Sequence, residues 1–170
     1  MKRLMFLSGV LMLSIGFACG QADKSQRPSP PATVSETIAS GATIKIDYSQ
    51  PSVKGRKVGD NIATYGKVWR TGANEATIFE VSKDVTVEGK PLAAGKYTLF
   101  SIPGEAEWVV IFNKQTGQWG TQYKESEDVL RVPVKTGKSS AFAEKFTFQI
   151  SKDGKVTGAW GDQSFAFNVK

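Results

Sequence analysis

KFTFQIS (residues 145–151) and SFAFNV (residues 164–169) decide the fold class of this chain, because every second residue of each stretch is apolar. The apolar positions are Phe146, Phe148, Ile150, Phe165, Phe167 and Val169. Successive side chains of a β-strand point to opposite faces of the sheet, so a period of two predicts strands with one buried face.

The same alternation runs through the chain from residue 42 onward. Strands are predicted at residues 43–48, 77–81, 85–89, 97–102, 108–113, 130–134, 145–151, 155–160 and 164–169. Short strands joined by Gly- and Asp-containing turns, such as SKDGK at residues 151–155, are typical of a two-layer antiparallel β-sandwich, either immunoglobulin-like or jelly-roll. One short helix is expected within DNIATYGKVW, residues 60–69. Tyr97 follows a glycine at the start of a strand, as in a tyrosine corner, whose phenol bonds to upstream backbone.

Residues 1–22 have the pattern of a secretory signal peptide. Lys2 and Arg3 precede an apolar run that ends near Ala18, and this run is shorter than the roughly 20 residues a membrane span needs. The pattern predicts an exported protein, either a periplasmic or outer-membrane lipoprotein or a secreted soluble one. Cys19 resembles the lipidated cysteine of bacterial lipoproteins, and cleavage after Ala22 is the alternative.

The mature chain is expected to consist of a tether and one domain. The Pro- and Ser-rich segment 23–41 predicts a flexible tether, and residues 42–170 predict the sandwich domain. A lipid anchor at Cys19 is the only membrane attachment this organisation implies.

Composition excludes several classes of function. The chain has no histidine and one cysteine, so a Ser-His-Asp or Cys-His catalytic set and a structural zinc site are excluded, and no metal or other cofactor is expected. The net charge is +6, but basic and acidic residues are interspersed, as in KESED at residues 124–128. Nucleic-acid binding needs clustered cations, so it is not expected.

Three polar segments, each following or preceding a strand, supply the candidate site. VWRTGANEAT (residues 68–77) holds the flat indole of Trp69, the guanidinium of Arg70, and the polar pair Asn74 and Glu75. The segment at residues 48–60 adds Tyr48 and Arg56, and the segment at residues 113–123 adds Trp119 and Tyr123. Loops at one end of a sandwich commonly carry binding residues, because the sheets hold them rigidly.

A structural interpretation competes with the ligand site at every position. Arg70 and Glu75 can pair and clamp their own loop, with Asn74 bonded to local backbone. Trp119 and Tyr123 can cap the open end of the sandwich. The ordinary roles of Arg56 and Arg131 are a solvated turn and a cation on the sheet surface.

Several motifs in the chain resemble those of one family. In sequence order they are YSQPSVKGR, WRTGANEAT, AGKYTLFSIP, WVVIFNK, WG followed three residues later by Tyr, and DVLRV. They are similar to an exported bacterial family catalogued as a domain of unknown function, DUF2911. The resemblance implies a secreted or surface-anchored all-β domain without an established activity.

Three functions are compatible with these residues. The first is a binding module for a small polar or anionic ligand, a sugar or an organic acid. The second is a structural or accessory envelope protein that binds another protein. The third is a histidine-free hydrolase or lyase in which Glu75, with a raised pKa, serves as acid or base and Arg70 or Arg56 stabilises negative charge. Convergence of Arg70, Glu75 and Trp119 on one cavity would favour the first.

Overall fold

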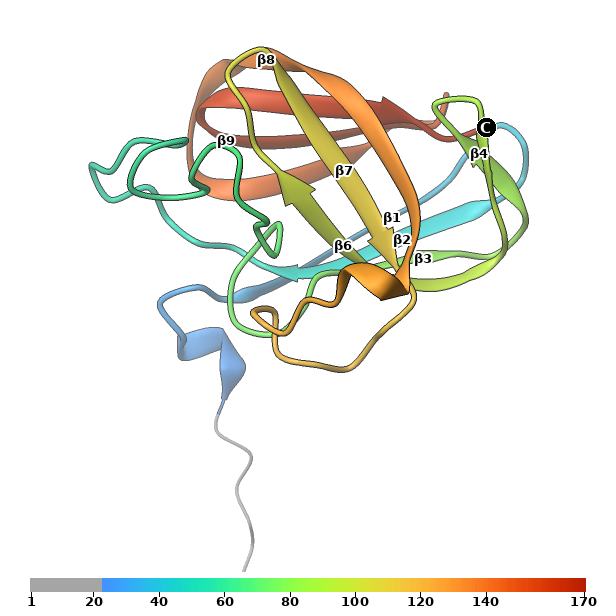
Figure 1. Ribbon diagram of the computed structural model, residues 1–170, viewed down its shortest axis with the longest axis horizontal. Coiled ribbons are helices and arrows are strands. Elements are labelled where there is room, and N and C mark those ends of the chain that lie inside the picture. The colour runs from blue at the N-terminus through green and yellow to red at the C-terminus, as the bar shows by residue number, and fades with distance from the viewer. Residues whose placement is uncertain (1–22) are drawn as a thin grey trace, which may run out of the picture.

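The computed structural model describes residues 23–170, and this part of the chain is built from β-strands (Figure 1). Its only helical elements are two single turns of 3₁₀ helix, η1 (Lys24–Gln26) and η2 (Glu125–Glu127). The predicted all-β class is confirmed. Cys19 and the predicted signal peptide lie outside the described residues.

Seven of the nine strands form one antiparallel sheet. They are β1 (Pro31–Thr37), β2 (Thr43–Ser49), β3 (Ile78–Val81), β6 (Gly95–Ile102), β7 (Glu107–Asn113), β8 (Asp128–Ile150) and β9 (Lys155–Asn168). Strands lie side by side in chain order, and the hairpin of β4 (Val85–Val87) and β5 (Lys90–Leu92) is inserted between β3 and β6. The sheet is therefore an up-and-down meander.

The large sheet curls until the chain that follows β2 meets the second half of β8 (Figure 1). Beyond β2, Val53 N–H donates to the carbonyl of Glu144 at 2.8 Å, and Phe146 N–H donates to the carbonyl of Pro51 at 2.9 Å. The opposing layers are thus two halves of one sheet, and they enclose the core in the sandwich-like manner predicted. Strand pairing follows from chain order, so neighbouring strands find each other through short connections.

The alternating residues of the C-terminal half fill this core as the sequence predicts. Phe146, Phe148, Phe165 and Phe167 are all buried. Two pairs of predicted strands are merged, however. Residues 130–134 and 145–150 belong to the single long strand β8, and residues 155–168 belong to β9. Register shifts between Lys138 and Thr147 bend β8, which lets one strand serve both halves of the curled sheet.

Two predicted turns are confirmed in detail. In the 151–155 hairpin, Ser151 N–H donates to the carbonyl of Lys155 at 3.0 Å. Gly154 has a φ of +87°, and a Cβ there would overlap the carbonyl oxygen of Val169, so glycine is required. The hydroxyl of Tyr97 donates to the carbonyl of Ala93 at 2.9 Å, which is the backward bond expected of a tyrosine corner.

The expected tether boundary and the expected helix are wrong. Residues 31–37 form β1 and pair with β2 over its whole length, so the sheet begins well before residue 42. As an edge strand, β1 is only half-buried, with Ala32 and Val34 packed on the core, and its sequence carries a weak alternation. No helix forms at residues 60–69, because Ala63 (φ 45°) and Gly66 (φ 73°) adopt left-handed conformations that a right-handed helix excludes.

Candidate functional site

The VWRTGANEAT segment extends the line of β3 along β6. Trp69 and Ser101 exchange both backbone hydrogen bonds, at 2.7 and 2.9 Å. Fully buried Thr71 has a φ of 50°, which is unfavourable for a β-branched residue. Its hydroxyl bonds to that of Ser101 at 2.9 Å and its carbonyl accepts from the hydroxyl of Thr77 at 2.9 Å. The segment is therefore anchored at defined points.

Trp69 points into the core. Its ring stacks on Trp160, with centroids 5.2 Å apart and an interplanar angle of 8°, and it meets Phe146 edge-on at 5.0 Å. Trp108 lies on another side, with ring centroids 6.1 Å apart. The indole is therefore half-buried against the aromatic core. Trp69 and Arg70 occupy successive strand positions, whose side chains point to opposite faces.

Arg70 packs against a second loop. Its Nη1 donates to the carbonyl of Asn74 at 3.3 Å. A Cβ at Gly120 would come within 2.5 Å of Arg70 Cδ, so the glycine of the WG motif makes room for the arginine stem. Among residues 23–170, Arg70 has no other hydrogen-bond partner and no ion pair with an acidic residue. The expected Arg70–Glu75 clamp is therefore wrong.

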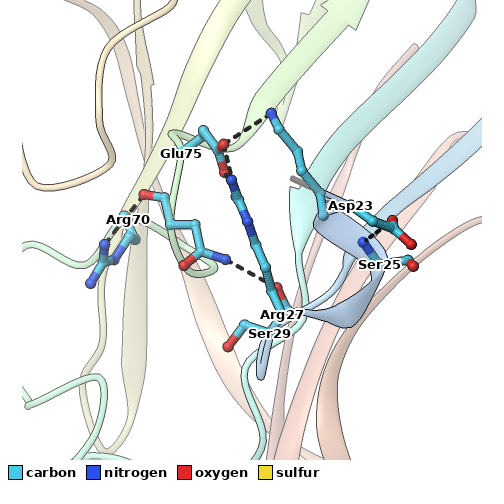
Figure 2. Close-up of polar contacts among 8 residues, drawn as sticks. Asp23, Ser25, Arg27, Ser29, Arg70 and Glu75 are labelled. Carbon is cyan, nitrogen blue, oxygen red and sulfur yellow. Dashed lines mark hydrogen bonds and ion pairs between the residues drawn. The ribbon is translucent and has the colours of Figure 1, made fainter. Parts of the chain in front are cut away.

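Glu75 binds the N-terminal segment instead. We call residues 23–30 the N-terminal strap. Arg27 Nη1 lies 2.9 Å from both carboxylate oxygens of Glu75, and Lys24 Nζ lies 3.0 Å from one of them (Figure 2). The amide of Asn74 donates to the carbonyl of Ser29 at 3.0 Å. In this way the strap crosses the motif and continues into β1.

These contacts determine the ionisation of Glu75. The hydrogen bond from Arg27, followed by a backbone hydrogen bond and that from Lys24, lowers the pKa of Glu75 to about 2. A general acid that works near neutral pH needs a raised pKa. The expectation that a catalytic Glu75 has a raised pKa is therefore wrong. The sequence did not reveal the two cations as partners, because they lie in a segment whose composition predicts a tether.

Tyr123 is held by a charged cluster at the start of β8. Its hydroxyl donates to Asp128 Oδ2 at 2.6 Å and accepts from Arg131 Nη2 at 2.6 Å. Its ring meets that of Phe100 edge-on at 4.9 Å. Burial, with the hydrogen bond to Asp128 next, raises the pKa of Tyr123 to about 12. Arg131 also pairs with Asp128 and Glu125, so it serves this cluster.

A hollow of about 350 Å³ opens where the two loops meet. Its lining is Val68, Trp69, Arg70, Phe100, Gly120, Thr121 and Tyr123. Glu75 lines two other hollows, each together with Asp47, and it does not line this one. Trp119 is 47% exposed and pairs its backbone with Glu75. Of the predicted site residues, Arg70, Tyr123 and part of Trp69 line this hollow. Phe100 also lines it, and no pattern in the sequence marked Phe100 as a site residue.

Tyr48 and Arg56 lie away from this hollow. Tyr48 is buried, and its hydroxyl accepts from Phe148 N–H at 3.1 Å across the closure of the sheet; burial raises its pKa. Exposed Arg56 donates to the carbonyls of Val53 at 3.0 Å and Ser52 at 2.7 Å. Both residues therefore stabilise chain conformation, and the expectation that they contact the same ligand as Arg70 is wrong.

The region described, residues 23–170, has no cluster of three acidic or cysteine side chains placed to hold a metal ion. In the same region no helix is long and apolar enough to cross a membrane.

The described chain is a small all-β domain built on one curled meander sheet. Its motif segment, residues 68–77, contacts both the loop at residues 113–123 and the N-terminal strap. The chain belongs to the family described as "Protein of unknown function (DUF2911)", whose model matches residues 29–169. The match begins in the strap and extends just past β9, so it includes every strand of the curled sheet. No curated protein and no solved structure matches the chain.

Proposed function

We propose that this protein is an extracytoplasmic binding protein for a small organic acid, whose carboxylate pairs with Arg70 in the hollow at the two loops. The observation that carries the proposal is a half-buried guanidinium that lines a hollow of about 350 Å³ and has one neutral partner among residues 23–170. A guanidinium offers five N–H donors in a planar fork that matches a carboxylate.

The surroundings leave Arg70 available to an external anion. Glu75, five positions along the chain, is neutralised by Lys24 and Arg27, so it does not compete for Arg70. The carbonyl of Asn74 fixes one guanidinium nitrogen and leaves the others without protein partners in the described chain. A partly desolvated cation with free donors favours an anionic ligand over a neutral one.

The hollow is also preorganised. Gly120 fixes the arginine stem, strained Thr71 fixes the backbone, and the cluster of Asp128 and Arg131 fixes Tyr123 against Phe100. Groups that are held in place before binding lose little conformational entropy on binding.

Thermal unfolding in the presence of small acids tests the proposal. At 100 times its Kd a ligand stabilises the native state by about 2.7 kcal/mol, which raises the Tm by several degrees. A panel of mono-, di- and tricarboxylates, inorganic phosphate and neutral sugars separates the ligand classes. We expect an acid to raise the Tm of the natural protein and not that of Arg70→Gln.

Arg56→Gln is the matched control, because it removes the same charge from an exposed turn away from the hollow. It should keep the full ligand-induced shift. If no acid raises the Tm, or if Arg70→Gln keeps the shift, the proposal fails. Stabilisation by a neutral sugar that survives in Arg70→Gln would also contradict it.

We propose that the domain is exported and held at a membrane by a lipid on Cys19. The charged and apolar pattern of residues 1–22 supports this, and the strap begins only four positions beyond Cys19. Metabolic labelling with a radioactive fatty acid tests it: the label should appear in the natural protein and disappear in Cys19→Ser. Unlabelled natural protein with an N-terminus at residue 23 would show ordinary cleavage instead.

A further inference from the structure

A second hollow, with a volume of about 680 Å³, lies on the outward face of β8 and β9, and we call it the β8–β9 hollow. The register shifts between Lys138 and Thr147 bend β8 here, so the outer face of this hairpin is concave. Small side chains cover its floor, among them Gly137, Ala159 and Ala166.

The charged side chains that line the β8–β9 hollow are all basic. Lys135, Lys138 and Lys155 contribute to the lining, and no Asp or Glu does. All three lysines are exposed, and none belongs to an ion pair within residues 23–170. Two acids close to these lysines lie outside the lining: Glu107 is opposite Lys135 in the sheet, and Asp153 lies two positions before Lys155. The hollow is therefore suited to an anionic occupant.

The lysines are too far apart to hold one small anion. Lys138 pairs in register with Gln163, eight positions from Lys155 along β9. At about 3.3 Å per residue, eight residues span up to roughly 26 Å along the strand, and less where the sheet bends. An occupant that reaches both ends must be an extended chain that carries repeated negative charge.

The walls favour a saccharide chain over a peptide or a membrane. Hydroxyl groups of Thr147, Thr157 and Ser164 line the hollow, and the ring of Phe142, 65% exposed, stands beside them. Sugars need this combination of hydrogen-bonding groups and one flat apolar surface. Peptide anchors need deep apolar pockets, which small residues do not form, and a planar bilayer does not enter a concave face.

We propose that the β8–β9 hollow binds an acidic polysaccharide, with its carboxylate or sulfate groups on the three lysines and a sugar ring on Phe142. This site is separate from that at Arg70 and does not depend on it. Binding should weaken as salt concentration rises, because exposed charge pairs are screened.

Affinity electrophoresis of the exported chain in gels that contain polygalacturonate tests the proposal, with neutral dextran as the reference polymer. The triple variant Lys135→Gln, Lys138→Gln, Lys155→Gln should bind polygalacturonate at least tenfold more weakly than the natural protein. Ala159→Phe fills the floor without changing charge, and it should bind at least fivefold more weakly. Circular dichroism should show unchanged folding in both.

Lys83→Gln, Lys96→Gln, Lys114→Gln is the matched control, because it removes equal charge from exposed lysines outside the hollow. It should bind within twofold of the natural protein, as should Arg70→Gln. Equal losses in the two triple variants would overturn the proposal, as would dextran binding as tight as polygalacturonate binding. Lysine-dependent binding to polyglutamate or to phosphatidylserine vesicles without binding to polygalacturonate would also overturn it and identify a peptide or membrane partner.

Discussion

One guanidinium nitrogen of Arg27 lies 2.9 Å from each carboxylate oxygen of Glu75 (Figure 2). The two residues are 48 positions apart in the chain, and their contact joins the N-terminal strap to the family motif. Segment 23–30 is consequently part of the folded domain, and the motif carboxylate is a structural anion.

Glu75→Gln should make stability less dependent on pH in the acid range. The pKa of Glu75 is about 2 in the folded protein against an ordinary value of 4.5, so its ionised form favours folding. This contribution is complete above about pH 4.5 and is lost as pH falls towards 2. The side chain is 41% exposed, so the difference at pH 7 should be at most about 1 kcal/mol.

Urea unfolding at pH 7, 4 and 2 measures this difference, and hydrogen exchange of residues 23–30 should show the strap loosened in Glu75→Gln. Glu36 is half-buried and has no ion pair among the described residues, so Glu36→Gln serves as the control. A stability gap between natural protein and Glu75→Gln that persists unchanged at pH 2 would show that Glu75 acts in another way.

Trp69→Ala should be far more damaging than Trp119→Ala. Trp69 is half-buried and contacts three aromatic rings of the core. Loss of a fully buried aromatic side chain costs about 3–5 kcal/mol, so loss of this one should cost about 2–4 kcal/mol. Trp119 is 47% exposed, so its removal should cost less than about 1 kcal/mol. Chemical denaturation measures both, and similar costs would contradict the core position of Trp69.

Tyr48→Phe should weaken the closure of the curled sheet. It removes the acceptor for the buried N–H of Phe148 and leaves this donor unsatisfied, at a cost of about 1–3 kcal/mol. Amide exchange at Phe148 should accelerate. Tyr65→Phe is the comparison, because the hydroxyl of Tyr65 meets the flexible amide of Gln163, and its loss should cost less. If Tyr48→Phe leaves the free energy of unfolding unchanged, another group must hold the closure of the sheet.

Tyr123 should ionise at unusually high pH. Burial and Asp128 raise its pKa to about 12 from an ordinary 10.0, so it favours folding below pH 10 and this contribution is lost as pH rises towards 12. The difference in ultraviolet titration between the natural protein and Tyr123→Phe isolates this tyrosine. Asp128→Asn should lower its midpoint. A titration midpoint near pH 10 in the natural protein would contradict the hydrogen bonding of Tyr123 to Asp128.

The sequence predicted the fold class well because strand alternation is a local property. Phe146, Phe148, Phe165 and Phe167 are spaced two apart, and any pleated strand places such residues on one face. The same rule places Trp69 and Arg70 on opposite faces, but whether either face is core or solvent depends on the neighbouring strands. β1 was not recognised because an edge strand buries little and needs few apolar residues.

By itself, the sequence determined most of the strands, the 151–155 turn, the Tyr97 corner and the absence of histidine chemistry, since each depends on residues close together in the chain or on composition. The tertiary structure decided which charges meet: Glu75 with Arg27 and Lys24, Tyr123 with Asp128 and Arg131, and Arg70 with no acid among the described residues. Ion pairs join groups by proximity in space, and the curling of one sheet brings distant segments together in a way that strand periodicity does not encode.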